Sequence, residues 1–127
     1  MNILIIEDDK LTLHALEQIL ESLGHKTTLA GNAEEAIERI KNETFDLVFS
    51  DIMMPGISGL SLVSILRKIN FFKMPIIAMS VLKDKPLLQA AFDAGATDFM
   101  LKPFTPEDLK TKLEIVKATV TVNVEKK

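Results

Sequence analysis

The sequence predicts an α/β domain in which five parallel strands alternate with five helices, and three observations carry that prediction. The chain has 127 residues, of which 47% are hydrophobic, enough for the core of one domain. Five short, apolar, β-prone stretches alternate with longer segments whose apolar residues recur at helical spacing. Parallel strands joined by right-handed crossovers all end at one edge of their sheet. Four of the five stretches run directly into reactive side chains, which are expected to meet at that edge: Asp8 and Asp9, Asp51, Ser80, and Lys102.

The first half of the chain predicts three strands and the two helices between them. Met1–Ile6 is almost continuously apolar, which is typical of a central parallel strand buried on both faces. Lys26–Ala30 is more polar, and Leu47–Phe49 gives the third strand. The first helix ends at Gly24, and the second begins with a capping box at Asn32. The polar second strand therefore belongs at the periphery of the sheet.

The second half of the chain repeats this alternation. Met74–Met79 and Asp98–Leu101 predict the fourth and fifth strands. A loop rich in residues that break regular structure, residues 54–59, precedes the third helix, and the fourth helix begins within Lys83–Pro86. The last helix is expected from Pro106 to about Val116, because a threonine N-cap, a first-turn proline and acidic residues favour helix initiation.

The strand order follows from which strands end in reactive groups. The second strand ends in Ala30-Gly31-Asn32, which offers no such group, so it is expected at an edge of the sheet. The doubly wound, flavodoxin-like order 2-1-3-4-5 satisfies this condition. That order places a crevice between the first and third strands, the two that end in aspartates.

The predicted edge has the chemistry of a site for a cation and an anion. Asp8, Asp9 and Asp51 brought close together would repel by about 4 kcal/mol per pair. Oxygen donors of this kind suit Mg²⁺, with Mn²⁺ as a substitute. A carboxylate can attack phosphorus to form an acyl phosphate, and Asp51 is the natural nucleophile, with Lys102 and Ser80 opposite it. An isolated Asp-Asp pair after a strand also suits the N-cap of the following helix.

These residues resemble the chemotaxis-type receiver domain of two-component response regulators. The resemblance extends through Val116, so residues 1–118 are expected to form the receiver domain and 119–127 a tail or linker. It implies that Asp51 accepts a phosphoryl group from a histidine kinase or phosphotransfer protein. The matching residues are Glu7-Asp8-Asp9, Asp51, Met54-Pro55-Gly56, Gly59, Ser80 and Lys102-Pro103-Phe104.

The resemblance also implies a metal site, a switch and an output face. Asp8, Asp9, Asp51 and the backbone carbonyl of Met53 would surround Mg²⁺, and the Lys102-Pro103 bond would be cis. Ser80 and Phe99 match the hydroxyl and aromatic switch positions, although Phe99 on its own also suits a core aromatic. A downstream protein would bind the fourth helix, fifth strand and fifth helix, and the chain would be a monomer or a phosphorylation-dependent dimer.

Three positions depart from the family pattern. Val81 stands where a small residue is common, which narrows access to Asp51. Met53 and Leu82 occupy positions thought to tune hydrolysis, and both are apolar, so neither can orient an attacking water by hydrogen bonding. These residues predict a long-lived acyl phosphate.

Other function classes fit the sequence less well. The net charge of −3 argues against a nucleic-acid surface, and the apolar runs are far too short to cross a bilayer. The chain has no cysteine, and its N-terminus lacks the pattern of a signal peptide, so a cytoplasmic location is expected by default. Metabolite phosphatases of the haloacid-dehalogenase type need an acid at the position of Met53, and no glycine-rich nucleotide motif follows the first strand. The chain is thus expected to be a signalling switch, not an enzyme. A constitutive interaction module that needs no phosphorylation stays open, as do three roles for residues 119–124: an edge strand, pairing with another chain, or a linker.

Overall fold

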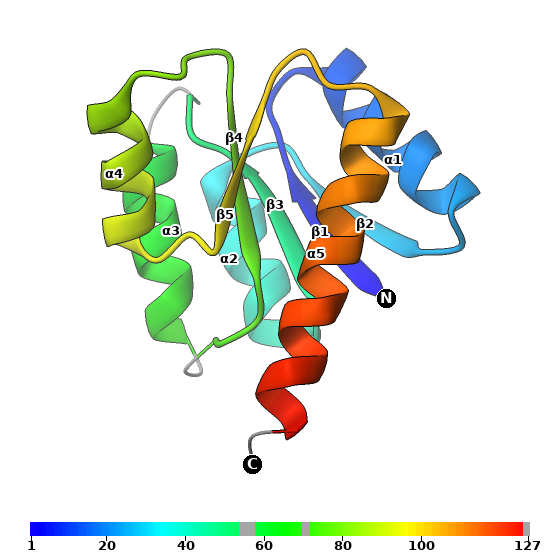
Figure 1. The fold of residues 1–127 in the computed structure, drawn as a ribbon. Coiled ribbons are helices and arrows are strands. Elements are labelled where there is room, and N and C mark those ends of the chain that lie inside the picture. The colour runs from blue at the N-terminus through cyan, green and yellow to red at the C-terminus, as the bar shows by residue number, and fades with distance from the viewer. Residues whose placement is uncertain (54–57, 70–71, 126–127) are drawn as a thin grey trace.

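The structure, a computed structural model, describes residues 1–53, 58–69 and 72–125 and shows the doubly wound α/β fold that the sequence predicts (Figure 1). All strand pairs are parallel, and the order is β2-β1-β3-β4-β5. The Met54-Pro55-Gly56 segment lies outside the described residues. The strands are β1 (Asn2–Ile6), β2 (Lys26–Ala30), β3 (Leu47–Asp51), β4 (Ile76–Ser80) and β5 (Asp98–Leu101).

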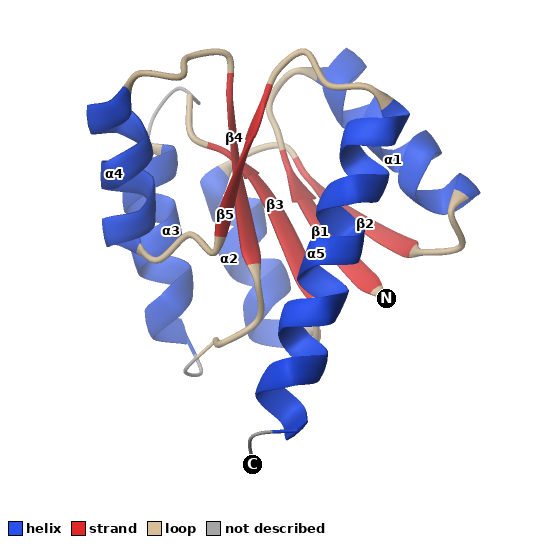
Figure 2. Cartoon of the chain, viewed as in Figure 1, coloured by secondary structure: helices blue, strands red, loops and turns tan. Residues whose placement is uncertain are grey.

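Five helices cover the two faces of this sheet, α1 and α5 on one face and α2, α3 and α4 on the other (Figure 2). Ile3 and Ile5 of β1 pack with leucines of α1 and α5, whereas Leu4 and Ile6 pack with α2 and α3. Because successive side chains of a strand point to opposite faces, a central strand needs an unbroken apolar run. The helices are α1 (Lys10–Ser22), α2 (Ala33–Asn42), α3 (Gly59–Lys68), α4 (Lys85–Ala94) and α5 (Pro106–Glu125).

Short polar side chains fix where four of the helices begin. Asp9, Asn32, Ser58 and Asp84 each accept a hydrogen bond from the backbone N–H three residues later, at 2.7–3.1 Å. Such caps satisfy N–H groups that the first helical turn leaves without a partner. Each of these four helices therefore begins directly after its capping residue.

The last helix is longer than predicted. It continues past Val116 through Glu125, so residues 119–124 are helical and do not form an edge strand. Valine and threonine cost only a few tenths of a kcal/mol each in a helix, and every residue added to an existing helix gains a hydrogen bond. The alternation of valine and threonine in residues 119–124 therefore did not indicate a strand. Among the described helices, none has the length and apolar character needed to cross a membrane.

Candidate functional site

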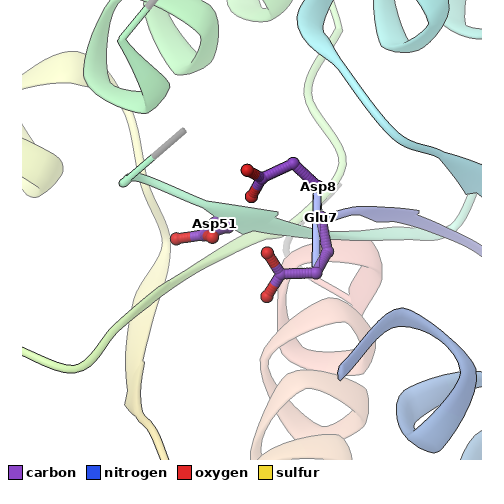
Figure 3. Close-up of side chains that lie close together, drawn as sticks. All are labelled: Glu7, Asp8 and Asp51. Atoms are coloured by element: carbon purple, nitrogen blue, oxygen red, sulfur yellow. The ribbon is translucent and has the colours of Figure 1, made fainter. Parts of the chain in front are cut away.

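Three carboxylates converge at the carboxyl edge of the sheet, between β1 and β3 (Figure 3). Glu7 and Asp8 directly follow β1, and Asp51 is the last residue of β3. One oxygen from each carboxylate lies within 4.8 Å of the others. The parallel pairing of β1 with β3, in which Ile6 lies beside Ser50, brings these strand ends together. We call Glu7, Asp8 and Asp51 the acidic cluster.

Asp51 is almost completely buried, with 3% of its surface exposed, and both of its carboxylate oxygens have donors. The Met53 N–H donates to Oδ1 at 2.9 Å, and the Lys102 ammonium donates to Oδ2 at 3.2 Å. Lys102 also donates to the buried carboxylate of Glu7. One ammonium thus holds two carboxylates that come from different strands.

Lys102 reaches the acidic cluster from the end of β5. Its backbone N–H donates to the carbonyl of Ser80 at 2.8 Å, which extends the pairing of β5 with β4 by one residue. The bond between Lys102 and Pro103 is cis, as the resemblance implied. Ser80 is itself the last residue of β4, so β3, β4 and β5 deliver Asp51, Ser80 and Lys102 to one edge.

Burial and crowding shift the charge states in the acidic cluster. Burial and the neighbouring Asp51 carboxylate raise the pKa of Glu7 to about 7. Burial also acts to raise the pKa of Asp51, but hydrogen bonds with Glu7, Met53 and Lys102 outweigh it and hold that pKa below its usual value. For Lys102, the two carboxylates outweigh burial and raise the pKa. The site therefore keeps Asp51 ionised and Lys102 charged at neutral pH.

Asp9 lies outside the acidic cluster, contrary to the predicted set of Asp8, Asp9 and Asp51. Its carboxylate accepts hydrogen bonds from the Thr12 N–H at 3.0 Å and the Thr12 hydroxyl at 2.6 Å, so it caps α1. Glu7 takes the expected place of Asp9 beside Asp51. The sequence held a signal for this exchange, because an aspartate directly before a helix suits its N-cap and Glu7 is the first residue after the strand.

The two predicted switch residues occupy neighbouring strands. Ser80 is fully buried, and its hydroxyl accepts a hydrogen bond from the Leu82 N–H at 3.0 Å. Phe99 on β5 pairs in register with Ala78 of β4 and packs in a small apolar cluster with Ala78 and Ala91. Its side chain is 9% exposed, so the aromatic ring already lies inside the protein.

Apolar side chains follow the two strands that end in Asp51 and Ser80. Met53 follows β3, and Val81 and Leu82 follow β4; these three side chains are 52%, 64% and 46% exposed. None of them carries a group that could orient a water molecule by hydrogen bonding.

The acidic cluster has the donors that Mg²⁺ requires. Its ligand atoms are carboxylate oxygens, which hard divalent cations prefer, and they lie close enough together to share one ion. Three carboxylates meet one ammonium in this cluster, so Lys102 offsets only part of their negative charge. A divalent cation would offset the remainder, so the residues present fit the metal.

Comparisons with known proteins agree with this geometry. The family model described as "Response regulator receiver domain" matches residues 3–114. The chain is 32% identical over 112 residues to the transcriptional regulatory protein CrdR of Helicobacter pylori, covering 88% of this chain and 53% of that protein. It is 35% identical over 114 residues to the two-component response regulator ARR14 of Arabidopsis thaliana, covering 87% of this chain and 29% of that protein. The chain thus spans about half or less of these relatives.

Two solved structures are similar to this chain over most of their length. A two-component response regulator from Clostridium difficile superposes with a TM-score of 0.88 at 31% identity, covering 93% of this chain and 96% of the other. The chemotaxis protein CheY4 of Vibrio cholerae superposes with a TM-score of 0.87 at 26% identity, covering 91% and 97%.

Proposed function

The chain belongs to the response regulator receiver domains of two-component systems, and on that premise we propose that Asp51 accepts a phosphoryl group from a histidine kinase or phosphotransfer protein. The observation that carries this proposal is the environment of Asp51. Its carboxylate is buried at the end of β3, oriented by the Met53 N–H and 3.2 Å from the Lys102 ammonium. A buried but ionised carboxylate beside a fixed cation suits nucleophilic attack on an anionic group.

In the proposed reaction, a carboxylate oxygen of Asp51 attacks phosphorus and forms an O–P bond. The P–N bond to the donor histidine breaks, and its electron pair stays on the ring nitrogen. Lys102 then offsets negative charge on the transferring oxygens, a role for which its ammonium is already placed. This self-modification makes the chain a signalling switch and not a metabolic enzyme.

Asp8 and Asp51, together with the backbone carbonyl of Met53, are the residues that we propose hold Mg²⁺, with Mn²⁺ as a substitute. The convergence of Glu7, Asp8 and Asp51 supports this assignment. Glu7 lies in the same cluster but is engaged by Lys102. When bound, the cation would neutralise charge on the phosphoryl oxygens and on the crowded carboxylates.

The proposed output follows from Ser80 and its neighbours. Drawing the Ser80 hydroxyl toward a phosphoryl group would break its hydrogen bond with the Leu82 N–H and so move the loop that leads into α4. We propose that a downstream protein reads this change on the face formed by α4, β5 and α5. We assign residues 1–118 to the receiver domain, because the buried part of α5 extends through Val116.

The test is the intact mass of wild type, Asp51→Asn and the control Asp93→Asn, an exposed aspartate on α4. Each is incubated with acetyl phosphate or phosphoramidate and Mg²⁺, and separately with a phosphorylated histidine kinase. Wild type and Asp93→Asn are expected to gain one phosphoryl group, and Asp51→Asn none. If wild type gained nothing from any donor, the chain would instead be a constitutive interaction module.

A further inference from the structure

Gly59, the first residue of α3, lies close against the backbone at the end of β3, the strand that carries Asp51. A Cβ built on Gly59 would lie 2.1 Å from the Cα of Ile52 and 2.5 Å from the carbonyl oxygen of Asp51. Non-bonded carbon atoms need about 3.5–4.0 Å. The start of α3 therefore rests directly on the backbone that carries Asp51, and this contact leaves no room for a side chain.

Both sides of this contact are held in place. The Ile52 N–H donates to the carbonyl of Met79 at 3.0 Å, which ties the end of β3 to β4. On the other side, Leu62 and Leu66 anchor α3 in the core, both fully buried. Ser58 caps the helix by accepting a hydrogen bond from the Ser61 N–H at 3.1 Å. An added methyl group at position 59 cannot be accommodated without moving the strand end or the helix.

The backbone that Gly59 contacts, at the end of β3, also orients the Asp51 carboxylate. The hydrogen bond from the Met53 N–H to Asp51 Oδ1 closes a tight turn centred on Ile52. The same carboxylate meets Lys102 through its other oxygen. A shift of the Ile52 backbone would therefore change the direction of both oxygens.

We propose that Gly59 is a positioning residue for phosphoryl transfer, which acts by seating α3 against the Asp51–Ile52 backbone. This proposal deepens the proposed function and rests on it for its rate measurement. A misplacement of about 1 Å at a reacting group can cost roughly 100-fold in rate. A side chain at position 59 should therefore slow phosphorylation even in molecules that have folded.

The test compares Gly59→Ala with two controls. Gly31 also follows a strand at the same edge of the sheet, but a Cβ there would meet nothing within 4 Å, so Gly31→Ala should behave as wild type. Leu66→Ala loosens the same helix away from Asp51. The readouts are the phosphorylation rate per folded molecule at saturating donor and Mg²⁺, the NMR shift of the Met53 amide, and the ¹³C shift of the Asp51 carboxyl.

Gly59→Ala is expected to be phosphorylated at least tenfold more slowly than wild type, with both NMR signals displaced. Leu66→Ala should lose stability but keep the wild-type rate per folded molecule. A folded Gly59→Ala protein with the wild-type rate would overturn the proposal. So would a Leu66→Ala protein that is slowed as much as Gly59→Ala, since the effect would then come from general loosening of α3.

Two further outcomes are distinguished from failure of the positioning role: wild type that is not phosphorylated, and a Gly59→Ala protein that does not fold. If wild type takes up no phosphoryl group, the proposed function fails; unchanged Met53 and Asp51 signals in Gly59→Ala would then overturn the positioning role as well. If Gly59→Ala does not fold, Ser58→Ala loosens the first turn of α3 without adding an atom near Ile52. That variant is expected to be two- to fivefold slower with a displaced Met53 signal, and wild-type values of both would overturn the proposal.

Discussion

Glu7 is the residue whose charge state most directly links the site to stability. Its pKa is about 7 in the folded protein against an ordinary value of 4.5. Between these values the folded protein holds the Glu7 proton more tightly than the unfolded chain does, so unfolding becomes easier as pH rises. The contribution of Glu7 to stability is full below about pH 4.5 and is lost as pH rises through about 7.

Glu7→Gln removes this titration, so without divalent metal the variant should gain stability relative to wild type as pH rises from 5 to 8. The lowered pKa of Asp51 has its effect only below the ordinary value of 3.8, outside this range. Other titrating groups, such as His25, are common to both proteins and cancel in the difference. The measurement is the free energy of unfolding in urea with EDTA; a difference that stays constant with pH would contradict the shift.

At the residue scale, the sequence placed Asp51, Ser80 and Lys102 at one edge because each directly follows or ends a strand. From the three successive acids after β1 it selected Asp8 and Asp9, whereas the structure brings Glu7 and Asp8 to Asp51. Which two of them face Asp51 depends on where the strand ends and the helix cap begins. In the structure, the hydrogen bonds of Asp9 with Thr12 draw its carboxylate to α1, and Glu7 is left to meet Lys102.

At the scale of elements, Arg67 at the end of α3 joins two loops that lie far apart in the sequence. Its guanidinium donates to the carbonyls of Gly95 at 2.8 Å and Met74 at 2.5 Å, and to the Thr97 hydroxyl at 3.0 Å. Arg67 thus ties the approach to β4 and the approach to β5 to one helix. Hydrogen bonds from a charged group are worth about 1.5–3 kcal/mol, and the Arg67 side chain itself is half-buried.

Arg67→Ala should therefore lower the free energy of unfolding by about 3 kcal/mol. Arg67→Lys should recover only a small part, because one ammonium cannot reach the four acceptors arranged around the planar guanidinium, which are the carbonyls of Phe72, Met74 and Gly95 and the Thr97 hydroxyl. The exposed neighbour Lys68→Ala is the matched control and should stay within about 0.5 kcal/mol of wild type. Urea unfolding monitored by circular dichroism measures the stability of all three variants. Wild-type stability in Arg67→Lys would show that the positive charge alone, and not the several N–H donors of the guanidinium, stabilises these loops.

The loops after β3 and β4 should set how long a phosphoryl group stays on Asp51. Met53 and Leu82 expose apolar side chains there and offer no hydrogen bond to an attacking water. The phosphorylated wild type is therefore expected to persist well beyond seconds in Mg²⁺. Leu82→Gln supplies an amide that can orient water and should speed dephosphorylation by roughly tenfold or more.

Leu11→Gln is the control for that substitution, because Leu11 is 83% exposed on α1 and makes the same change of side chain. Decay is followed by intact mass after the donor is removed. Loss of the phosphoryl group from wild type within seconds, or equal acceleration by both glutamine variants, would show that these apolar positions do not control hydrolysis.

The ends of the strands and helices could be predicted from the sequence in some cases, and in others they depend on strand pairing or on the preceding helix. β2 and β5 were predicted with the bounds that the structure shows, since a glycine turn precedes each strand and residues that break regular structure or carry charge follow it. β3 was predicted to end at Phe49 but continues through Asp51, because pairing with β4 carries polar residues into the strand. α5 exceeded its predicted end because an established helix continues through residues of low helix propensity.

At the scale of the whole molecule, the strand order could be predicted because the chemistry of the strand ends limits it. Only β2 ends without a reactive group, and an order with β2 at the edge brings β1 beside β3. The observed pairing of β1 with both β2 and β3 agrees with this reasoning. The close approach of Gly59 to Ile52 could not be predicted in the same way, since it depends on how deeply α3 packs onto the sheet.

Metal binding should be visible in the stability of the whole domain. A cation that binds only the folded state stabilises it by about 2.7 kcal/mol at a concentration 100-fold above its dissociation constant. Wild type is therefore expected to unfold at higher urea concentration in Mg²⁺ than in EDTA with NaCl of equal ionic strength. Asp8→Asn should lose most of this gain and, in EDTA, should be more stable than wild type because a repulsive charge has gone.

Asp9→Asn is the decisive comparison, because it makes the same chemical change one residue further along the chain. Its carboxylate caps α1 and lies outside the acidic cluster, so this variant should lose up to about 1 kcal/mol in both buffers and keep the full gain from Mg²⁺. The reverse result, in which Asp9→Asn abolishes the gain and Asp8→Asn keeps it, would restore the assignment that the sequence alone suggested. Equal loss in both variants would mean that Asp9 leaves its cap when the ion binds.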